Sequence, residues 1–208
     1  MGKFKTKQEE FWVGKFGDEY TTRNYSKKKI ANNIVFFSRI FSHTSPIRSV
    51  IELGAGSGNN LLALKQLFPE IKLSAVEINK QAVTKLKKIK NIEIHHSSIL
   101  NFNVKHTYEL ALVKGILIHI NPEELTKVYD LLYKATNRYI CIAEYYSPIP
   151  TEILYRGNKG FLFKRDFCGE LLDRYKDLSL RKYGFSYHRD PAFPQDDITW
   201  FLLKKNNS

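Results

Sequence analysis

The chain has 208 residues, of which 43% are hydrophobic and 13% aromatic, which excludes a disordered protein and suffices for one folded α/β domain. No apolar run approaches the length that spans a bilayer, and the charged N-terminus lacks the apolar core of a secretory signal. Cys141 and Cys168 lack the spacing of a metal site or a disulfide framework. We therefore expect a cytoplasmic protein with no bound metal and no membrane partner.

Lysine and arginine number 33 against 21 acidic residues, which gives a formal net charge of +12. This excess favours an anionic partner, such as a nucleic acid, a phosphorylated metabolite or an anionic surface. The basic residues are scattered, however, as they are on ordinary solvated helix faces. Charge alone therefore does not point to nucleic acid, and nothing in the composition indicates an oligomeric state.

Helical periodicity opens the chain, and strands alternate with helices after Pro46. The pattern predicts helices over 7–16, 26–42, 59–68, 80–88, 122–135 and 165–175. It predicts strands over 49–53, 72–77, 92–95, 109–114, 139–144, 179–187 and 197–204, with an irregular segment over 145–163. Asn121 is the expected N-cap of the helix that starts at Pro122.

Alternation of this kind predicts a parallel sheet with helices on both faces. The last two strands lack a crossover helix and should be antiparallel neighbours at one end of the sheet. The predicted fold class is a Rossmann-like, doubly wound seven-stranded α/β sheet, mostly parallel, with an antiparallel strand near the C-terminus. We expect a single domain over 1–208, with a helical cap over 1–45, a cofactor-binding core over 46–146, and a substrate-side insertion with the C-terminal strands over 147–208.

The stretch VIELGAGSGNN, residues 50–60, joins a predicted strand to a predicted helix through glycines at alternate positions. Gly54, Gly56 and Gly58 indicate a tight turn in which the backbone can approach a ligand closely. In a parallel sheet this turn lies at the carboxyl ends of the strands, where ligands bind. Glu77 ends the next strand, where a carboxylate suits the hydroxyls of a ribose.

Two ligands fit such a turn. A dinucleotide site has the spacing G-x-G-x-x-G, whereas this chain has G-x-G-x-G with Glu52 just ahead of it. A fixed carboxylate does not help to bind pyrophosphate, but it does help to bind an ammonium group. The pattern therefore favours S-adenosyl-L-methionine, which carries a sulfonium and an amino group, over a nicotinamide cofactor. A tight turn that binds no ligand is the alternative.

Four segments resemble motifs of the class I S-adenosylmethionine-dependent methyltransferases, and the resemblance extends over 48–204. The segments are ELGAGSG at 52–58, AVEIN at 75–79, SSIL at 97–100 and LVKGILIHI at 112–120. The resemblance implies cofactor contacts from Glu52, Gly54, Ala55, Gly56, Asn59, Glu77, Ile78, Ser98, Ile99, Lys114 and Gly115. Ser98 stands where many members have Asp, so backbone groups would replace the usual carboxylate contact to the adenine amine.

A narrower resemblance covers nearly the whole chain. Its segments include QEEFW at 8–12, EYY at 144–146, YRG at 155–157, FKRDF at 163–167 and DDITW at 196–200. They are similar to methylases associated with bacterial pseudaminic acid biosynthesis clusters. The resemblance implies a sugar or nonulosonic acid-pathway metabolite as the substrate. It also places Trp12 in a lid over the cofactor, although an amphipathic helix packed on the sheet is the alternative.

Methyl transfer requires alignment of the acceptor, exclusion of water and, for a hydroxyl or amine acceptor, a base. His119 follows the fourth predicted strand and is a candidate base, or else a cap for the helix at 122. Glu144 ends the fifth predicted strand at the ligand edge and is a candidate catalytic residue with Tyr145. A carboxylate acceptor would need no base.

Substrate contacts are expected from the long segment after the fifth strand and from the C-terminal turn. The candidates are Tyr146, Tyr155, Arg156, Arg165 and His188. The arginines could hold a carboxylate or phosphate of an acidic sugar. For Arg165 the alternative is a surface ion pair with Asp166 or Glu170. For the tyrosines the alternative is that they cover the core.

The expected function is therefore methyl transfer to a small molecule. A nucleic-acid methyltransferase is an alternative that the charge favours, but the chain lacks the Asn/Asp-Pro-Pro-aromatic motif and the Pro-Cys nucleophile of such enzymes. A binding protein that uses the fold without catalysis is a second alternative.

Overall fold

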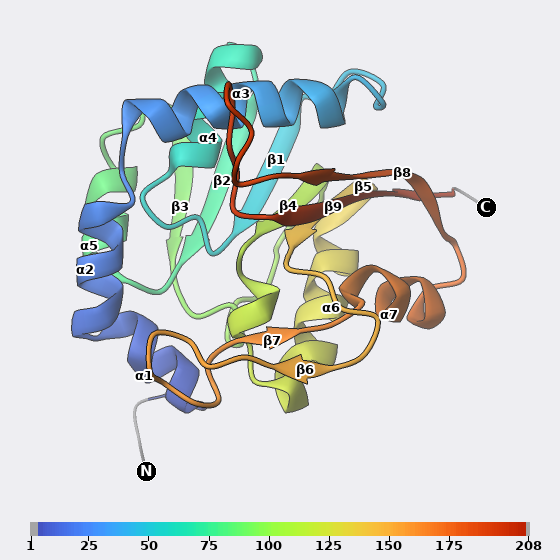
Figure 1. The fold of residues 1–208 in the computed structure, drawn as a ribbon. Helices are drawn as coiled ribbons and strands as arrows, with labels where there is room; N and C mark the ends of the chain where they lie inside the picture. Colours follow the sequence, from blue (N-terminus) through green and yellow to red (C-terminus); the bar gives the residue numbers. More distant parts are fainter. Residues whose placement is uncertain (1–3, 207–208) are drawn as a thin grey trace. The chain divides into compact units, whose positions relative to one another are not determined.

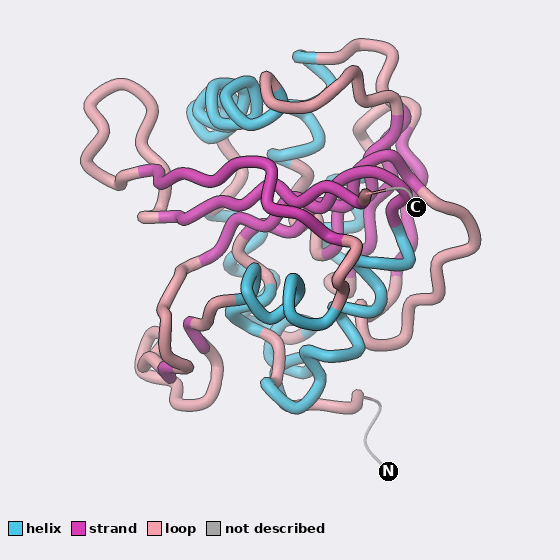
Figure 2. Tube along the Cα trace, turned by 90° about the vertical axis from the view of Figure 1, so that its right-hand side faces the viewer, coloured by secondary structure: helices cyan, strands magenta, loops and turns pink. Residues whose placement is uncertain are grey.

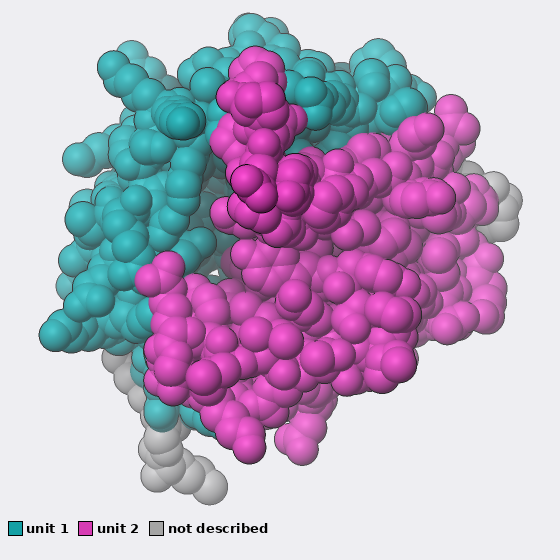
Figure 3. All heavy atoms as spheres, in the orientation of Figure 1, with its two compact units in different colours: residues 1–103 teal, residues 104–208 magenta. Residues whose placement is uncertain are grey.

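The computed structural model describes residues 4–206. Two compact units make up the chain, residues 1–103 and residues 104–208, coloured teal and magenta in Figure 3. Residues 1–3 and 207–208, at the two ends of the predicted domain, lie outside the described part. No helix within residues 4–206 has both the length and the apolar character that crossing a membrane requires.

The first unit contains three parallel strands in the order β3-β2-β1. Their bounds are β1 Ser49–Leu53, β2 Lys72–Glu77 and β3 Ile92–His96. All residues of β1 and β2 after the first are buried, as expected where helices cover both faces of a parallel sheet. Such strands give a continuous apolar run, and for this reason β1 and β2 begin and end at the predicted residues.

Five helices accompany these strands among residues 4–103. They are α1 Lys7–Val13, α2 Lys15–Arg23, α3 Lys27–Phe41, α4 Asn59–Leu67 and α5 Lys80–Leu86. The prediction of one helix over 7–16 is wrong, because Gly14 is extended, with φ −81° and ψ −165°, and the chain changes direction there (Figure 1). The second helix, α2, is rich in polar residues, which masks its periodicity in the sequence.

In the larger sheet of the second unit, four strands lie in the order β4-β5-β9-β8. Their bounds are β4 Tyr108–Lys114, β5 Thr136–Glu144, β8 Leu178–Ser186 and β9 Ile198–Lys205. Strands β4 and β5 are parallel, whereas β9 is antiparallel to both β5 and β8, as predicted. The loop between β8 and β9 extends beyond the strand ends (Figure 2).

The helices of the second unit are α6 Leu125–Ala135 and α7 Phe167–Arg174. Two short 3₁₀ turns precede α6, namely η1 Leu117–His119 and η2 Pro122–Glu124. The helix predicted from 122 therefore starts as a 3₁₀ turn, and Asn121 caps it as expected by accepting from the Glu123 N–H at 3.2 Å. The segment predicted to be irregular contains a short antiparallel pair, β6 Thr151–Glu152 with β7 Phe163–Lys164.

The seven strands of the larger sheet, in which β9 is antiparallel to its neighbours, confirm the predicted Rossmann-like, mostly parallel α/β class. The predicted cap, core and insertion, with divisions at residues 45 and 146, stay a prediction. Cys141 and Cys168 are both buried, and neither is in a disulfide bond.

Candidate functional site

The glycine turn after β1 has the left-handed backbone that its sequence predicts. Gly54, Gly56 and Gly58 have φ values of +73°, +53° and +83°. A Cβ on Gly58 would lie 2.6 Å from Cδ1 of Ile89, so packing requires a glycine there. A Cβ on Gly56 would meet nothing within 4 Å, so the backbone of Gly56 faces open space in which a ligand could lie.

The carboxylate of Glu77 lies against this turn and is almost fully buried. Its Oε2 accepts from the Gly56 N–H and its Oε1 accepts from the Asn79 N–H, both at 2.7 Å. Burial raises the pKa of Glu77, and these backbone hydrogen bonds act in the opposite direction. The turn also bonds to β2 directly, because Gly54 and Ala55 donate to the carbonyl of Val76.

Glu52 lies in β1, just before the turn, and only 1% of its surface is exposed. Its Oε1 accepts from Nδ2 of Asn60 at 2.5 Å, and Oδ1 of Asn60 accepts from Nδ2 of Asn33 at 2.8 Å. This buried polar chain connects β1 to α4 and α3. Asn33 and Asn60 were not predicted from the sequence, where their only signal is an amide in each of two predicted helices. Contact between Glu52 and a cofactor stays a prediction.

The two N-terminal helices attach to the loops at the strand ends of the first unit. Ser57 Oγ donates to the carbonyl of Thr21 at 3.0 Å, and Asn59 Nδ2 donates to that of Asn24 at 2.7 Å. Asn79 Nδ2 bonds both the Trp12 carbonyl, at 3.1 Å, and Asp18 Oδ1, at 2.8 Å. These hydrogen bonds hold α1 and α2 to the segments that follow β1 and β2, and both the lid interpretation and the contact of Trp12 with a cofactor stay predictions.

The residues after β2 and β3 lie beside these attachments. Ile78 follows Glu77, and its carbonyl lies 3.1 Å from Nε2 of His96. Ser98 is buried, and its hydroxyl donates to the carboxylate of Glu9 in α1. Ile99, next to it, is half-buried. Glu9 was not predicted as a site residue, because most of the first unit separates it from Ser98 in the sequence.

In the second unit Glu144 is buried at the end of β5. Its Oε1 accepts from the N–H groups of Ile116 and Leu117 at 2.8 and 2.9 Å. Burial raises the pKa of Glu144 to about 7, although the backbone N–H groups and the nearby Lys114 ammonium lower it. Gly115 has φ +67°, and a Cβ there would meet nothing within 4 Å. The backbone at Gly115 therefore faces open space at this strand end.

His119 ends η1 and is almost fully buried. Its Nδ1 lies 2.6 Å from the carbonyl oxygen of Phe161, and a carbonyl can only accept, so Nδ1 carries the proton and Nε2 the lone pair. Burial lowers the pKa of His119 to about 4, with a smaller opposing effect from the Phe161 carbonyl. The ring packs on Tyr155, with centroids 4.8 Å apart. Asn121, and not His119, caps the following helix.

We expect the His119 imidazole to stay neutral, with its proton on Nδ1, from pH 8 down to about pH 5. The reason is that burial disfavours the charged ring and lowers its pKa to about 4. Nitrogen-15 NMR of the ring checks this, with a His119→Gln variant to assign the signal among the six histidines. A ring that titrates near its ordinary pKa, or that carries its proton on Nε2, would contradict the expectation.

The tyrosines after Glu144 differ in exposure. Tyr145 is half-buried, and burial raises its pKa to about 12, so its hydroxyl stays protonated near neutral pH. The Lys164 ammonium lies 5.5 Å from the Tyr145 ring centroid. Tyr146 is 42% exposed. Its ring lies 6.1 Å from that of Phe201. Catalysis by Tyr145 and substrate binding by Tyr146 stay predictions.

The two candidate anion-binding arginines have different surroundings. Nε of Arg165 lies 2.7 Å from Oε1 of Glu170, which is the ion pair that the sequence left as the alternative. Oε2 of Glu170 accepts from the Tyr129 hydroxyl at 2.6 Å. Arg156 is exposed, has φ +49°, and lies beside the ring of Tyr155. Arg156 therefore fits anion binding better than Arg165 does.

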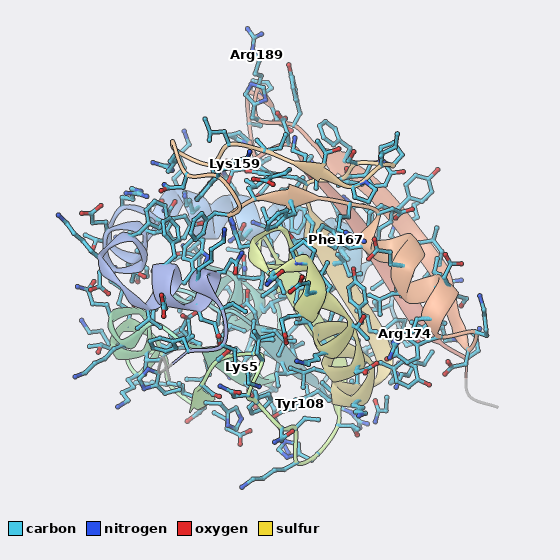
Figure 4. All side chains as sticks on the ribbon, turned by 90° about the horizontal axis from the view of Figure 1, so that it is seen from below. Lys5, Tyr108, Lys159, Phe167, Arg174 and Arg189 are labelled. Carbon is cyan, nitrogen blue, oxygen red and sulfur yellow. The ribbon has the colours of Figure 1, made fainter. Side chains whose placement is uncertain are left out.

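His188 lies just after β8, and its Nδ1 is 2.7 Å from Oδ2 of Asp197 across the hairpin. The loop that follows carries Arg189, which points away from the hairpin (Figure 4). His188 therefore helps to close this loop, and substrate binding by it stays a prediction. Within residues 4–206, no three His, Cys, Asp or Glu side chains gather in a group that could hold a metal ion.

The comparisons with known proteins agree with this geometry. Residues 50–138 match the family model of a methyltransferase domain. This match contains the glycine turn, Glu77 and η1. The search of curated proteins found no match.

Three solved structures are similar to nearly the whole chain. The 1,6-didemethyltoxoflavin-N1-methyltransferase of Burkholderia thailandensis, with its substrate and S-adenosylhomocysteine, is 12% identical with a TM-score of 0.69, covering 96% of this chain and 87% of that one. The magnesium protoporphyrin IX methyltransferase of Synechocystis is 10% identical with a TM-score of 0.66, covering 95% and 97%. The N-methyltransferase NodS of Bradyrhizobium japonicum is 11% identical with a TM-score of 0.64, covering 96% and 97%. At these identities the likeness shows the fold.

Proposed function

We propose that this chain is an S-adenosyl-L-methionine-dependent methyltransferase that acts on a small molecule. The observation that carries the proposal is the open backbone at Gly56 beside the Glu77 carboxylate, within a segment that matches a methyltransferase domain. The similar solved structures support it, because each is a methyltransferase crystallised with S-adenosylhomocysteine.

The residues present fit the cofactor in shape and in chemistry. The glycine turn leaves room over its backbone, and Glu77 offers carboxylate lone pairs that can accept from ribose hydroxyls. Lys114 and Gly115 lie at the end of β4, where the backbone is also open. When bound, S-adenosylmethionine supplies a methyl group activated by its sulfonium.

Two buried groups of the second unit suit the removal of a proton from a hydroxyl or amine acceptor. His119 is neutral near pH 7 and carries its lone pair on Nε2. Glu144 has a pKa of about 7, close to the value that a general base needs. Both depend on η1, because it contains His119 and its first N–H groups hold Glu144.

Calorimetry with S-adenosylhomocysteine and with NAD tests the cofactor assignment. We expect binding of the first and none of the second, because the turn has the spacing G-x-G-x-G and not G-x-G-x-x-G. Binding of NAD alone would overturn the proposed function.

The acceptor that we propose is a sugar or nonulosonic acid-pathway metabolite, in a bacterial cytoplasm. The resemblance to pseudaminic acid-associated methylases supports it, together with the exposed Arg156 and the net charge of +12, which favour an anionic substrate. A mass-shift screen of nonulosonic acids and their nucleotide-linked precursors tests it by a gain of one methylene unit. If methylation is confined to unrelated compounds, the sugar assignment is wrong and the methyltransferase assignment stands.

A further inference from the structure

A carboxylate from the N-terminal helix is buried at the end of β3. Glu9 lies in the first turn of α1 and is only 7% exposed. Its Oε2 accepts from the N–H groups of Lys5 and Thr6 at 2.8 and 2.9 Å, which completes the capping box of α1. Its Oε1 accepts from the Ser98 hydroxyl. The two oxygens thus have separate partners, and helix capping uses only Oε2.

The Ser98 hydroxyl fixes the direction of Glu9 Oε1. Ser98 Oγ accepts from the Leu100 N–H at 3.0 Å, so the hydroxyl proton is directed to Glu9. A second hydrogen bond joins the same two segments, because Lys5 Nζ donates to the Leu100 carbonyl at 3.0 Å. A carboxylate oxygen can accept two hydrogen bonds, and Oε1 receives one from the described residues. One acceptor position on a buried carboxylate therefore remains at this strand end.

The order of the strands places this acceptor relative to the proposed cofactor. The glycine turn ends β1, Glu77 ends β2, and Ser98 follows β3, in which His96 pairs in register with Glu77. A nucleoside whose ribose is held at Glu77 has the glycine turn on one side. Its base therefore extends to the other side, toward Ser98 and Glu9.

We propose that Glu9 Oε1 accepts a hydrogen bond from the exocyclic amine of the nucleobase, and that it thereby selects a 6-amino purine over a 6-oxo purine. The proposal rests on the proposed function, because the ligand is the adenosyl group of that cofactor. An amine donates to the carboxylate, whereas a 6-oxo group presents a second acceptor to it. The remaining acceptor position of Oε1 and the 6-oxo oxygen are then both left without a donor. Glu9, a residue of α1, is then a specificity-determining residue.

The test compares the affinities for S-adenosylhomocysteine and for S-inosylhomocysteine, measured by calorimetry on the full chain. We expect the wild-type protein to prefer the adenosyl compound by about tenfold or more. Glu9→Gln should bring the ratio of the two affinities to about one or below. The Lys5 and Thr6 N–H groups hold the amide oxygen at the position of Oε2, so the amide nitrogen, a donor, faces the base. Glu10→Gln, at the exposed neighbouring acid, is the matched control and should keep the wild-type ratio.

The ratio separates base recognition from a merely structural role. If Glu9 only holds α1 in place, its substitution weakens both ligands equally and leaves the ratio unchanged, which overturns the inference. A wild-type ratio near one overturns it without any variant. Ser98→Ala, which removes the hydroxyl that directs Oε1, should also lower the ratio and serves if Glu9→Gln does not fold. If the wild-type protein binds neither compound, the proposed function fails as well.

Discussion

Replacing Glu77 with alanine should weaken S-adenosylhomocysteine binding by roughly 1–3 kcal/mol, or about 5- to 150-fold. The change removes the proposed ribose acceptor. It also leaves the N–H groups of Gly56 and Asn79 without the oxygens that accept from them at 2.7 Å. Isothermal titration calorimetry on the purified chain measures the effect, and circular dichroism confirms that the variant is folded.

The matched control for this change is Glu70→Ala. Glu70 is an exposed acid that precedes β2, whereas Glu77 is the buried acid that ends it. We expect the control to bind as the wild-type protein does. Equal affinities of the Glu77 variant and the control would refute the ribose-binding role of Glu77.

The contribution of Glu144 to the stability of the protein should fall as the pH rises from about 4.5 to 7. Burial raises the pKa of its carboxyl group in the folded state to about 7, from 4.5. Below pH 4.5 the group is protonated in both the folded and the unfolded states, and its contribution is fully present. As the pH rises through this window the unfolded state ionises first, so the contribution of Glu144 to the free energy of unfolding falls, by a limit on the order of 3 kcal/mol.

Urea unfolding at pH 5 and pH 8 measures this effect, and Glu144→Gln is the variant to compare. The amide does not ionise, so the variant should lose less stability between these two pH values than the wild-type protein does. Its carbonyl oxygen can still accept from Ile116 and Leu117, which preserves the hydrogen bonds of η1. The same pH dependence in both proteins would show that folding does not raise the pKa of Glu144.

Local signals in the sequence determined the strands and the glycine turn. Strands β1 and β2 are buried on both faces, so their apolar runs mark their ends without reference to any partner. The tight turn was predictable because glycine is the residue that most readily adopts a left-handed backbone, and Gly58 has φ +83°. The antiparallel pair β8 and β9 followed from the missing crossover helix.

Only the tertiary structure decided which groups the buried carboxylates meet. Glu9 with Ser98, Glu52 with Asn60, and Arg165 with Glu170 are pairs that local periodicity does not encode. A buried charge must find hydrogen-bond partners wherever the fold brings them, and those partners come from separate elements. The sequence by itself therefore determined the sheet and its turn, whereas the environments of Glu9, Glu77 and Glu144 exist only once the chain has folded.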